Sequence, residues 1–290
     1  MNNFRAAILL TLAMAGFAVE DVMFKLANQS LPQGTILTIV GFSGALVLAI
    51  AATIRRENVF SRDFFHPFVI LRNVTEMIGT ACFVMAITTV PLTLASAVAQ
   101  ALPLAVMAGA AIFLGEKVGW RRWAAVGVGF IGVMVIVRPG LEGFNVSTLW
   151  AVAAVMAMAV RDVITRRVPD HIASLPVASW GFMFAGFAGL VIAAAQGELP
   201  VPQGMQWLPV MTSMTAGIGA YVALIISSRI GEISAVIPFR YTRLLFAMIL
   251  GALVFGERPD TWTLVGSALI VGSGLYAIYR ERKRVREARS

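Results

Sequence analysis

Ten apolar runs divide the chain, and each is long enough to cross a lipid bilayer as a helix. Short polar segments separate them, and several contain turn-forming residues, as in Pro32-Gln33-Gly34. A hydrocarbon core of about 30 Å needs a helix of about 20 residues, and lipid offers no hydrogen-bond partner to open backbone groups. The pattern therefore predicts ten transmembrane helices, at approximately residues 5–27, 35–54, 68–88, 93–114, 121–137, 147–165, 174–195, 207–228, 234–255 and 261–279.

The composition agrees with a membrane protein and excludes other classes. Hydrophobic residues make up 59% of the chain and charged residues 13%, and the mean hydropathy is +0.83. An ordinary soluble domain has about 25% charged residues. These values exclude a soluble globular protein, a disordered chain and a disulfide scaffold. Cys82 is the single cysteine, so the chain cannot form a disulfide within itself and offers no cysteine cluster for a metal.

Lysine and arginine fall mainly in alternate loops. With the N-terminus placed inside, sixteen of the 23 lie on the cytoplasmic side, two (Arg138 and Arg258) lie outside, and five lie within the predicted spans. Because cytoplasmic loops carry the excess of basic residues, we expect both termini in the cytoplasm. The net charge of +8 then belongs to loops and a tail beside a membrane surface. We expect the lipid bilayer and a small-molecule substrate as partners, and no nucleic acid.

The two halves of the chain share short sequence matches. Ala-Val-Glu-Asp-Val at 18–22 returns as Ala-Val-Arg-Asp-Val at 159–163, and Gly-Glu-Lys at 115–117 returns as Gly-Glu-Arg at 256–258, both at an offset of 141. Each half holds five spans, an odd number, so the second half enters the membrane inverted. The predicted fold is an all-α integral membrane protein, with ten transmembrane helices in one domain (1–290) built from inverted repeats at approximately 1–141 and 142–290.

Ten spans, a five-plus-five duplication and a Gly-Glu-Lys/Arg motif closing the fourth and ninth spans resemble the drug/metabolite transporter superfamily, specifically its EamA family. The resemblance covers nearly the whole chain. Pro103, 12 residues before Gly115, matches a proline typical of the family. The second half departs from that pattern, because Leu244 holds the equivalent position and the proline has moved to Pro238.

The resemblance implies a multi-pass protein of a bacterial inner membrane that exports a small metabolite from the cytoplasm. Within the superfamily the sequence most resembles the YddG-type exporters of aromatic amino acids. It therefore implies a secondary transporter that exports aromatic and other neutral amino acids by alternating access. We expect no cofactor, and a monomer, because ten spans can already enclose a path. The alternative within the transporters is an exporter of another class of metabolite or of a drug.

Three pairs of opposite charge lie within the spans at i,i+4 spacing, at which side chains on a helix are neighbours. One interpretation is structural neutralisation near helix ends, with long side chains reaching towards water. The other is functional, because the first and third pairs occupy equivalent repeat positions near opposite mouths of a pathway and would stabilise alternating closed states. The pairs are Asp21–Lys25, Arg72–Glu76 and Asp162–Arg166.

Four further ionisable residues in the spans have no partner at this spacing: Glu20, Arg161, Arg240 and Arg243. Charges in a membrane span are costly and suggest function by default. Either they pair across helices, for example with Glu20, or the arginines face a wet cavity and attract a carboxylate, which a guanidinium binds in bidentate geometry. The sequence leaves both interpretations open.

Polar and aromatic residues near the midplane are candidates for a substrate pocket, since a small amphipathic ligand needs an apolar pocket with few polar groups. Helix packing is the alternative explanation for each aromatic. Pro103 and Pro238 remove helix hydrogen bonds and are candidate bends in spans 4 and 9. The candidate binding residues are Thr80, Phe83, Gln100, Trp180, Tyr221, Phe239, Arg240 and Tyr241.

Competing functions find less support in the sequence. The two histidines, His66 and His171, lie in predicted loops without metal-ligand spacing, so we expect neither a metal site nor an enzyme. There is no G-x-x-x-x-G-K-[ST] loop for ATP. A channel would need a continuous polar stripe or a selectivity ring, and none is evident. A channel and a membrane scaffold remain the alternatives from other functional classes.

Overall fold

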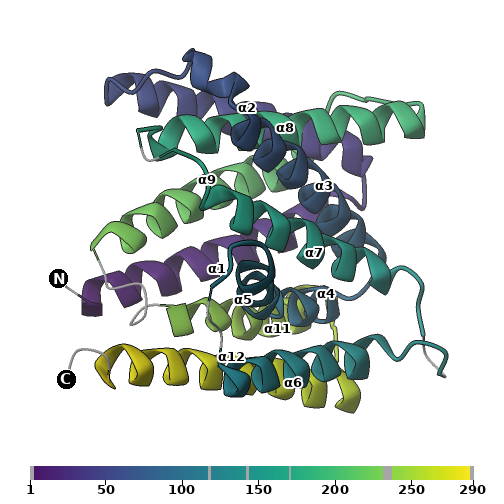
Figure 1. Ribbon diagram of the computed structural model, residues 1–290. Helices are drawn as coiled ribbons and strands as arrows, with labels where there is room; N and C mark the ends of the chain where they lie inside the picture. Colours follow the sequence, from purple (N-terminus) through teal and green to yellow (C-terminus); the bar gives the residue numbers. More distant parts are fainter. Residues whose placement is uncertain (1–2, 117–118, 142–143, 170, 231–236, 288–290) are drawn as a thin grey trace.

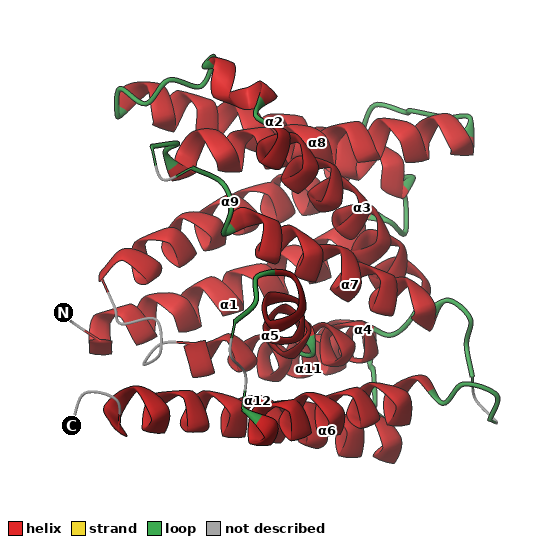
Figure 2. Cartoon of the chain, in the orientation of Figure 1, coloured by secondary structure: helices red, strands yellow, loops and turns green. Residues whose placement is uncertain are grey.

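The computed structural model describes residues 3–116, 119–141, 144–169, 171–230 and 237–287. This part of the chain is helical and contains no strand (Figure 2). Its helices are α1 (Asn3–Ala27), α2 (Gln33–Ile54), η1 (Arg62–Phe65), α3 (Pro67–Thr89), α4 (Leu92–Ala99), α5 (Leu102–Phe113), α6 (Trp120–Val137), α7 (Thr148–Thr165), α8 (Ser174–Gln196), η2 (Gly204–Gln206), α9 (Trp207–Ile230), η3 (Ile237–Tyr241), α11 (Thr242–Phe255) and α12 (Thr261–Glu287).

Ten segments of the described chain are long and apolar enough to cross a membrane. They coincide with the ten predicted spans to within a few residues, so the predicted fold class is confirmed. The fourth span is broken into α4 and α5 at Gln100 and Ala101, and Pro103 is the second residue of α5. The ninth span begins as the short η3, which contains Pro238, and continues as α11. Because proline donates no backbone hydrogen bond, both irregularities fall where the sequence placed bends.

The most extensive packing joins helices from different halves of the chain. Helix α1 lies against α9, α3 against α7, α2 against α8, and α6 against α12 (Figure 1). The repeat equivalents of α1 and α9 are α7 and α3, so exchanging the two halves of the chain converts the α1–α9 pair into the α7–α3 pair. The α2–α8 and α6–α12 pairs each join two equivalent helices, so the exchange leaves them unchanged. This is the arrangement that an inverted repeat requires.

Glycine allows the α2–α8 pair to approach backbone to backbone. A Cβ on Gly34 would lie 2.5 Å from the amide nitrogen of Ala193, and a Cβ on Gly41 would overlap the backbone of Gly186. The α6–α12 pair is also close, because a Cβ on Gly132 would lie 2.8 Å from the carbonyl oxygen of Gly266. Small residues that let helices approach are typical of membrane interfaces, and here they join the two halves.

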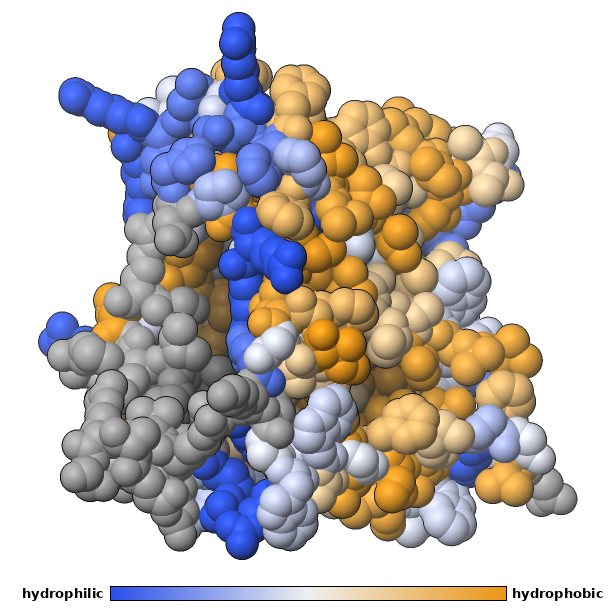
Figure 3. Space-filling view, viewed as in Figure 1, coloured by the Kyte–Doolittle hydropathy of each residue, from blue (hydrophilic) through white to orange (hydrophobic). Residues whose placement is uncertain are grey.

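Both chain ends lie at the same end of the helix bundle (Figure 1). We call this end the termini side and the other the far side. Helix α1 runs from the termini side to the far side, and α7, its repeat equivalent, runs the opposite way (Figure 1). Apolar side chains cover much of the face in Figure 3, and polar side chains gather over the termini-side end of α2 and η1. Such a surface suits a bundle that stands in lipid.

Candidate functional site

A central cavity of about 280 Å³ lies between the two halves. Helices α1, α2, α3 and α5 contribute to its wall from one half, and α7, α8, α9, η3 and α11 contribute from the other. Five of the predicted binding residues line it: Thr80, Phe83, Gln100, Tyr221 and Arg240. The inverted halves thus bring together positions that are far apart in the sequence.

Seven charged side chains line this mostly apolar cavity. Such a concentration of charge inside a membrane protein requires pairing, contact with water or a ligand. The seven are Glu20, Asp21, Arg72, Glu76, Arg161, Arg240 and Arg243.

Glu76 is the centre of one charge cluster. Its carboxylate lies 2.9 Å from an Arg72 nitrogen and 2.8 Å from an Arg161 nitrogen. The predicted pairing of Arg72 with Glu76 is therefore confirmed. Arg161 also donates to the neighbouring Asp162 at 2.8 Å. Arg161 thus pairs with an acid on another helix and also lines the cavity. Both interpretations of this residue, pairing across helices and facing a cavity, therefore apply.

Asp21 pairs with Arg243, whose guanidinium lies 2.7 Å from the carboxylate. The guanidinium also lies 5.3 Å from the ring centres of Phe17 and Phe83. The predicted pairing of Asp21 with Lys25 is wrong. Arg243 reaches Asp21 from α11 in the other half, and the lysine finds a different acid. Spacing along one helix cannot reveal a partner that tertiary packing supplies.

Glu20 and Arg240 form no ion pair and no side-chain hydrogen bond among the described residues, although both line the cavity. The Glu20 carboxyl group rests against α9, where a Cβ on Gly217 would lie 2.5 Å from its Cδ. The charged groups near Arg240 are Asp162 and two further arginines. The other five charged residues of the cavity wall form ion pairs with one another, so Glu20 and Arg240 are the acid and the base that remain without an ion-pair partner among the described residues.

Lys25 pairs with Glu257 on the far side, and we call this contact the far-side pair. The lysine ammonium lies 3.0 Å from the Glu257 carboxylate and donates to the carbonyl oxygen of Val90 at 2.9 Å. The carboxylate also accepts the amide hydrogens of Leu92 and Thr93, at 2.7 and 2.9 Å, at the start of α4. Side-chain exposure is only 18% for Lys25 and 10% for Glu257.

The environment of Glu257 stabilises its ionised form. Burial raises the pKa of the carboxyl group, but hydrogen bonds from the Thr93 and Leu92 amides and from Lys25, together with the charge of Lys25, outweigh it. The pKa therefore lies below its ordinary value of 4.5. A carboxylate that accepts amide hydrogens at a helix N-terminus is also favoured by the helix dipole. The far-side pair is thus a built contact between α1, α4 and the end of α11.

Arg166 pairs with Glu116 on the termini side, and we call this contact the termini-side pair. The predicted pairing of Asp162 with Arg166 is wrong, because Asp162 pairs with Arg161 and Arg166 lies at the end of α7, within reach of the segment after α5. Arg166 and Lys25 are repeat equivalents at an offset of 141, as are Glu257 and Glu116. The termini-side pair is about half exposed, at 48% and 49%.

Three candidate binding residues lie outside the cavity wall. Trp180 is buried, donates to the carbonyl oxygen of Val59 at 3.1 Å and packs on Phe64. Phe239 is 38% exposed. Tyr241 is buried, with its hydroxyl against Gly274 of α12. The surroundings of these three aromatic residues therefore fit helix packing, the alternative to a role in binding.

Sequence reasoning missed several residues of the site. Phe17, Phe24 and Phe182 line the cavity, but nothing distinguishes them from other aromatics in an apolar chain. Glu116 and Glu257 were visible as a repeated Gly-Glu motif. Their partners follow from the same offset that relates Lys25 to Arg166, so repeat equivalence was the signal that could have identified the two pairs.

Comparisons with known proteins place these features in context. The model of the EamA-like transporter family matches residues 4–138 and 145–279. The chain is 27% identical to an S-adenosylmethionine uptake transporter of Rickettsia felis, over 94% of this chain and 92% of that protein. It is 27% identical to a riboflavin transporter of Rhizobium johnstonii, over 74% and 71%. It is 25% identical to a pseudopaline exporter of Pseudomonas aeruginosa, over 91% and 92%.

A solved crystal structure matches with a TM-score of 0.62 and 20% identity, over 96% of this chain and 98% of the other. This likeness shows the fold alone.

Proposed function

The chain belongs to the EamA-like transporter family, and on this premise we propose that it exports small zwitterionic metabolites, above all aromatic and other neutral amino acids, by alternating access. Its relatives are transporters, not enzymes, and their names include both uptake and export. The proposal therefore concerns the substrate, the direction and the residues that act.

One observation carries the choice of substrate: the mostly apolar wall of the central cavity holds an acid, Glu20, and a base, Arg240, that form no ion pair within the described part of the chain. An amino acid carries an ammonium and a carboxylate. A guanidinium binds a carboxylate in bidentate geometry, and a carboxylate accepts hydrogen bonds from an ammonium. We assign the substrate carboxylate to Arg240 and the ammonium to Glu20.

The aromatic wall suits an apolar side chain. Phe17, Phe83 and Phe182 line the cavity together with Tyr221, and the rings of Phe182 and Tyr221 meet edge to face at 5.6 Å. Ligand pockets range from about 300 to 1,000 Å³, so a cavity of about 280 Å³ lies just below the lower end of this range. A single amino acid suits this size better than a large cofactor.

The far-side and termini-side pairs give a basis for alternating access. They occupy equivalent positions in the inverted halves, and each joins the α1 or α7 helix to the end of the span that carries the Gly-Glu motif. Breaking one pair while keeping the other would expose the cavity to one side at a time. The buried far-side pair and the half-exposed termini-side pair support a state that is closed on the far side.

The proposed setting is a bacterial inner membrane with both termini in the cytoplasm, and the protein acts as a monomer. The support for this orientation is the distribution of basic residues, because the loops that share the termini side hold most of them. The termini side is then the cytoplasmic side. The cavity is enclosed by helices of one chain, so no second copy is needed to form it.

Counterflow in proteoliposomes tests the proposal. Vesicles loaded with unlabelled tryptophan are diluted into a trace of labelled tryptophan, and a carrier accumulates label transiently and saturably. Protein-free vesicles and vesicles with the Glu20→Gln/Arg240→Gln protein serve as controls. Flux that ignores the internal load and does not saturate would indicate a channel. An absence of flux for every amino acid tested would refute the substrate assignment.

A second candidate function is uptake of S-adenosylmethionine, a larger amino acid derivative that also carries a sulfonium charge. It is favoured by the similarity to S-adenosylmethionine uptake transporters over 94% of this chain. The same vesicles separate the two candidates, because the preferred substrate inhibits tryptophan counterflow at the lower concentration. Direction is tested in intact cells: an exporter releases labelled substrate into the medium faster when expressed, and an uptake carrier retains it.

A further inference from the structure

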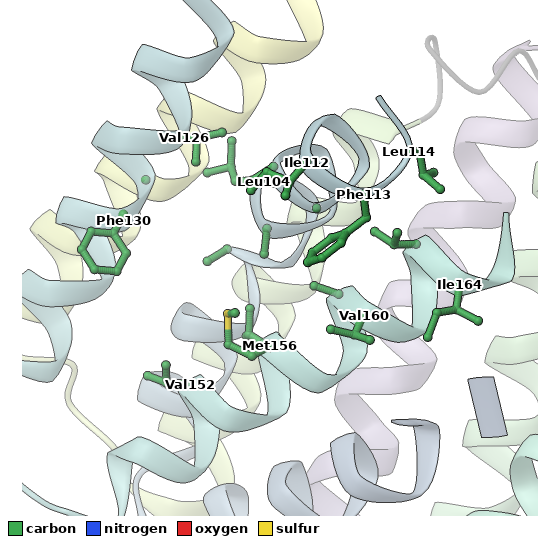
Figure 4. Close-up of a pocket in the computed structure, with 18 of the residues that line it drawn as sticks. Leu104, Ile112, Phe113, Leu114, Val126, Phe130, Val152, Met156, Val160 and Ile164 are labelled. Carbon is green, nitrogen blue, oxygen red and sulfur yellow. The ribbon is translucent and has the colours of Figure 1, made fainter. Parts of the chain in front are cut away.

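A second hollow, larger than the central cavity, opens on the outside of the helix bundle between α5, α6 and α7. Its volume is about 630 Å³. Leu104 and Ile112 of α5, Val126 and Phe130 of α6, and Met156 of α7 are among its lining residues (Figure 4). We call this hollow the α5–α7 groove. All of its lining residues are apolar except one, Arg167.

The groove shares only Val155 with the wall of the central cavity. Several of its large apolar residues are exposed, including Phe113 at 67% and Phe130 at 63%. Without a polar group along its length, it cannot orient a solute by hydrogen bonds. A hydrocarbon chain needs no hydrogen bonds to bind there, because burial of apolar surface is non-directional.

Both helices that flank the groove end their apolar stripes in an arginine on the termini side. On α7, the lining residues Val160, Val163 and Ile164 lead to Arg167, which lies two residues past the helix end at Thr165. On α6, Val126 and Phe130 line the groove, and Arg122 lies one turn before Val126 on the same stripe. The groove therefore has a basic mouth at one end and an apolar length beyond it.

Arg167 is placed to hold an anion at that mouth. One of its guanidinium nitrogens donates to the carbonyl oxygen of Phe113 at 2.9 Å. It forms no ion pair with an acid among the described residues. A guanidinium has five N–H donors, so four remain for a phosphate. Trp120 and Trp123, exposed at the start of α6, are typical of the membrane interface where headgroups lie.

The dimensions also match a lipid. Val152 lies thirteen positions before Thr165, the last residue of α7, which at about 1.5 Å per residue is about 20 Å. One leaflet contributes about half of the 30 Å hydrocarbon core. An acyl chain that starts at the basic mouth can therefore lie along the groove within one leaflet.

We propose that the α5–α7 groove binds an anionic phospholipid, with its phosphate at Arg122 and Arg167 and an acyl chain along α5, α6 and α7. The lipid belongs to the cytoplasmic leaflet on the orientation proposed above. It holds α5, half of the broken fourth span, against α7. Apart from Val155, the residues that line this site are not those that line the central cavity.

Native mass spectrometry of the whole protein tests this site. The protein in detergent is mixed with equal amounts of phosphatidylglycerol and phosphatidylcholine that carry the same acyl chains, and the ratio of retained lipids is measured. Two basic side chains near a membrane surface favour an anionic lipid by about tenfold or more. We expect that preference in the wild-type protein, and a ratio near unity in the Arg122→Gln/Arg167→Gln variant.

Two further variants make the result specific. Arg55→Gln/Arg62→Gln removes two exposed basic residues from the same side, away from the groove, and should keep the preference. Ala108→Phe fills the groove from α5 and should abolish retention of the tightly held lipid. An equal preference in the Arg122/Arg167 variant and the wild type would overturn the proposal. A dimer lost in the Ala108→Phe variant, without lipid preference, would assign the groove to a second copy instead and also overturn it.

Discussion

The Lys25 ammonium lies 3.0 Å from the Glu257 carboxylate, although 232 residues separate the two in the sequence. Adding the repeat offset of 141 to Lys25 gives Arg166, and subtracting it from Glu257 gives Glu116. These two residues form the other pair, at the opposite end of the bundle. One inverted repeat thus produces two equivalent ion pairs, one buried and one half exposed.

The far-side pair predicts a dependence of stability on pH. The pKa of Glu257 lies below its ordinary value of 4.5, so its contribution is present above pH 4.5 and is lost as the pH falls through the lowered pKa. We expect Glu257→Gln to melt below the wild type at pH 7, and the difference to shrink below about pH 4.5. Thermal unfolding in detergent across this range measures it. Glu198→Gln, at an exposed glutamate, is the control and should track the wild type.

The two unpaired charges of the cavity predict complementary effects on substrate choice. Arg240→Gln should raise the half-saturating concentration of tryptophan by about 10- to 100-fold, since a hydrogen bond to a charged group contributes about 1.5–3 kcal/mol. It should leave inhibition by tryptamine, which lacks the carboxylate, nearly unchanged. Glu20→Gln should instead spare indole-3-propionate, which lacks the ammonium. Competition against labelled tryptophan in proteoliposomes measures each case.

The matched control for this pair is Arg121→Gln, at a basic residue outside the cavity. It should change none of the three affinities. An Arg240→Gln protein that loses tryptophan and tryptamine equally would remove the carboxylate assignment. A Glu20→Gln protein that loses tryptophan and indole-3-propionate equally would remove the ammonium assignment.

The buried pair of Asp21 and Arg243 predicts a large cost for removing one partner. Side-chain exposure is 5% for Asp21 and 24% for Arg243, and breaking a buried pair costs about 3–5 kcal/mol because the other charge is left uncompensated. We expect Asp21→Asn and Arg243→Gln each to lower the melting temperature strongly. The double variant should recover part of the loss. Asp260→Asn, which breaks the more exposed pair with Arg138, should cost about 1 kcal/mol or less.

Close backbone contact between α2 and α8 predicts that Gly41 tolerates no side chain. A Cβ at this position would overlap the Gly186 backbone, and overpacking costs about 1–3 kcal/mol. We therefore expect Gly41→Ala to lower the melting temperature. Gly127→Ala on α6, where a Cβ meets nothing within 4 Å, should be neutral or slightly stabilising. Equal melting of the two variants would contradict the contact between the helices.

The sequence predicted the ten spans well, because each run of apolar residues is dictated by the thickness of the bilayer. The inverted repeat was also predictable, since an odd number of spans per half leaves only one outcome. Arg72 and Glu76 pair as their i,i+4 spacing indicates.

Pairing across helices was not predictable in the same way. Asp21 and Lys25 have the same spacing as Arg72 and Glu76, yet each finds a partner in the other half. Helical spacing reports neighbours on one helix and contains no information on what another helix brings close. Trp180 likewise gave no sign in the sequence of whether it faces the cavity or the Val59 carbonyl oxygen. The α5–α7 groove gave no sign in the sequence either, because its lining residues are all apolar except Arg167.

Reciprocal labelling of the cavity tests alternating access most directly. Met14 and Phe24 both line the cavity on α1, nearer the termini side and the far side respectively. Each is changed to cysteine in a Cys82→Ala background, and a membrane-impermeant maleimide is added to vesicles of either orientation. Glu257→Gln or Glu116→Gln is then introduced to break the far-side or the termini-side pair.

We predict that Glu257→Gln increases labelling of the cysteine at position 24 from the far side and decreases labelling of the cysteine at position 14 from the termini side. Glu116→Gln should do the reverse. Losing a charged hydrogen bond of about 1.5–3 kcal/mol shifts the balance between states by about tenfold or more. Labelling that changes in the same direction in both variants, or in neither, would contradict an account in which two equivalent pairs alternately close one cavity.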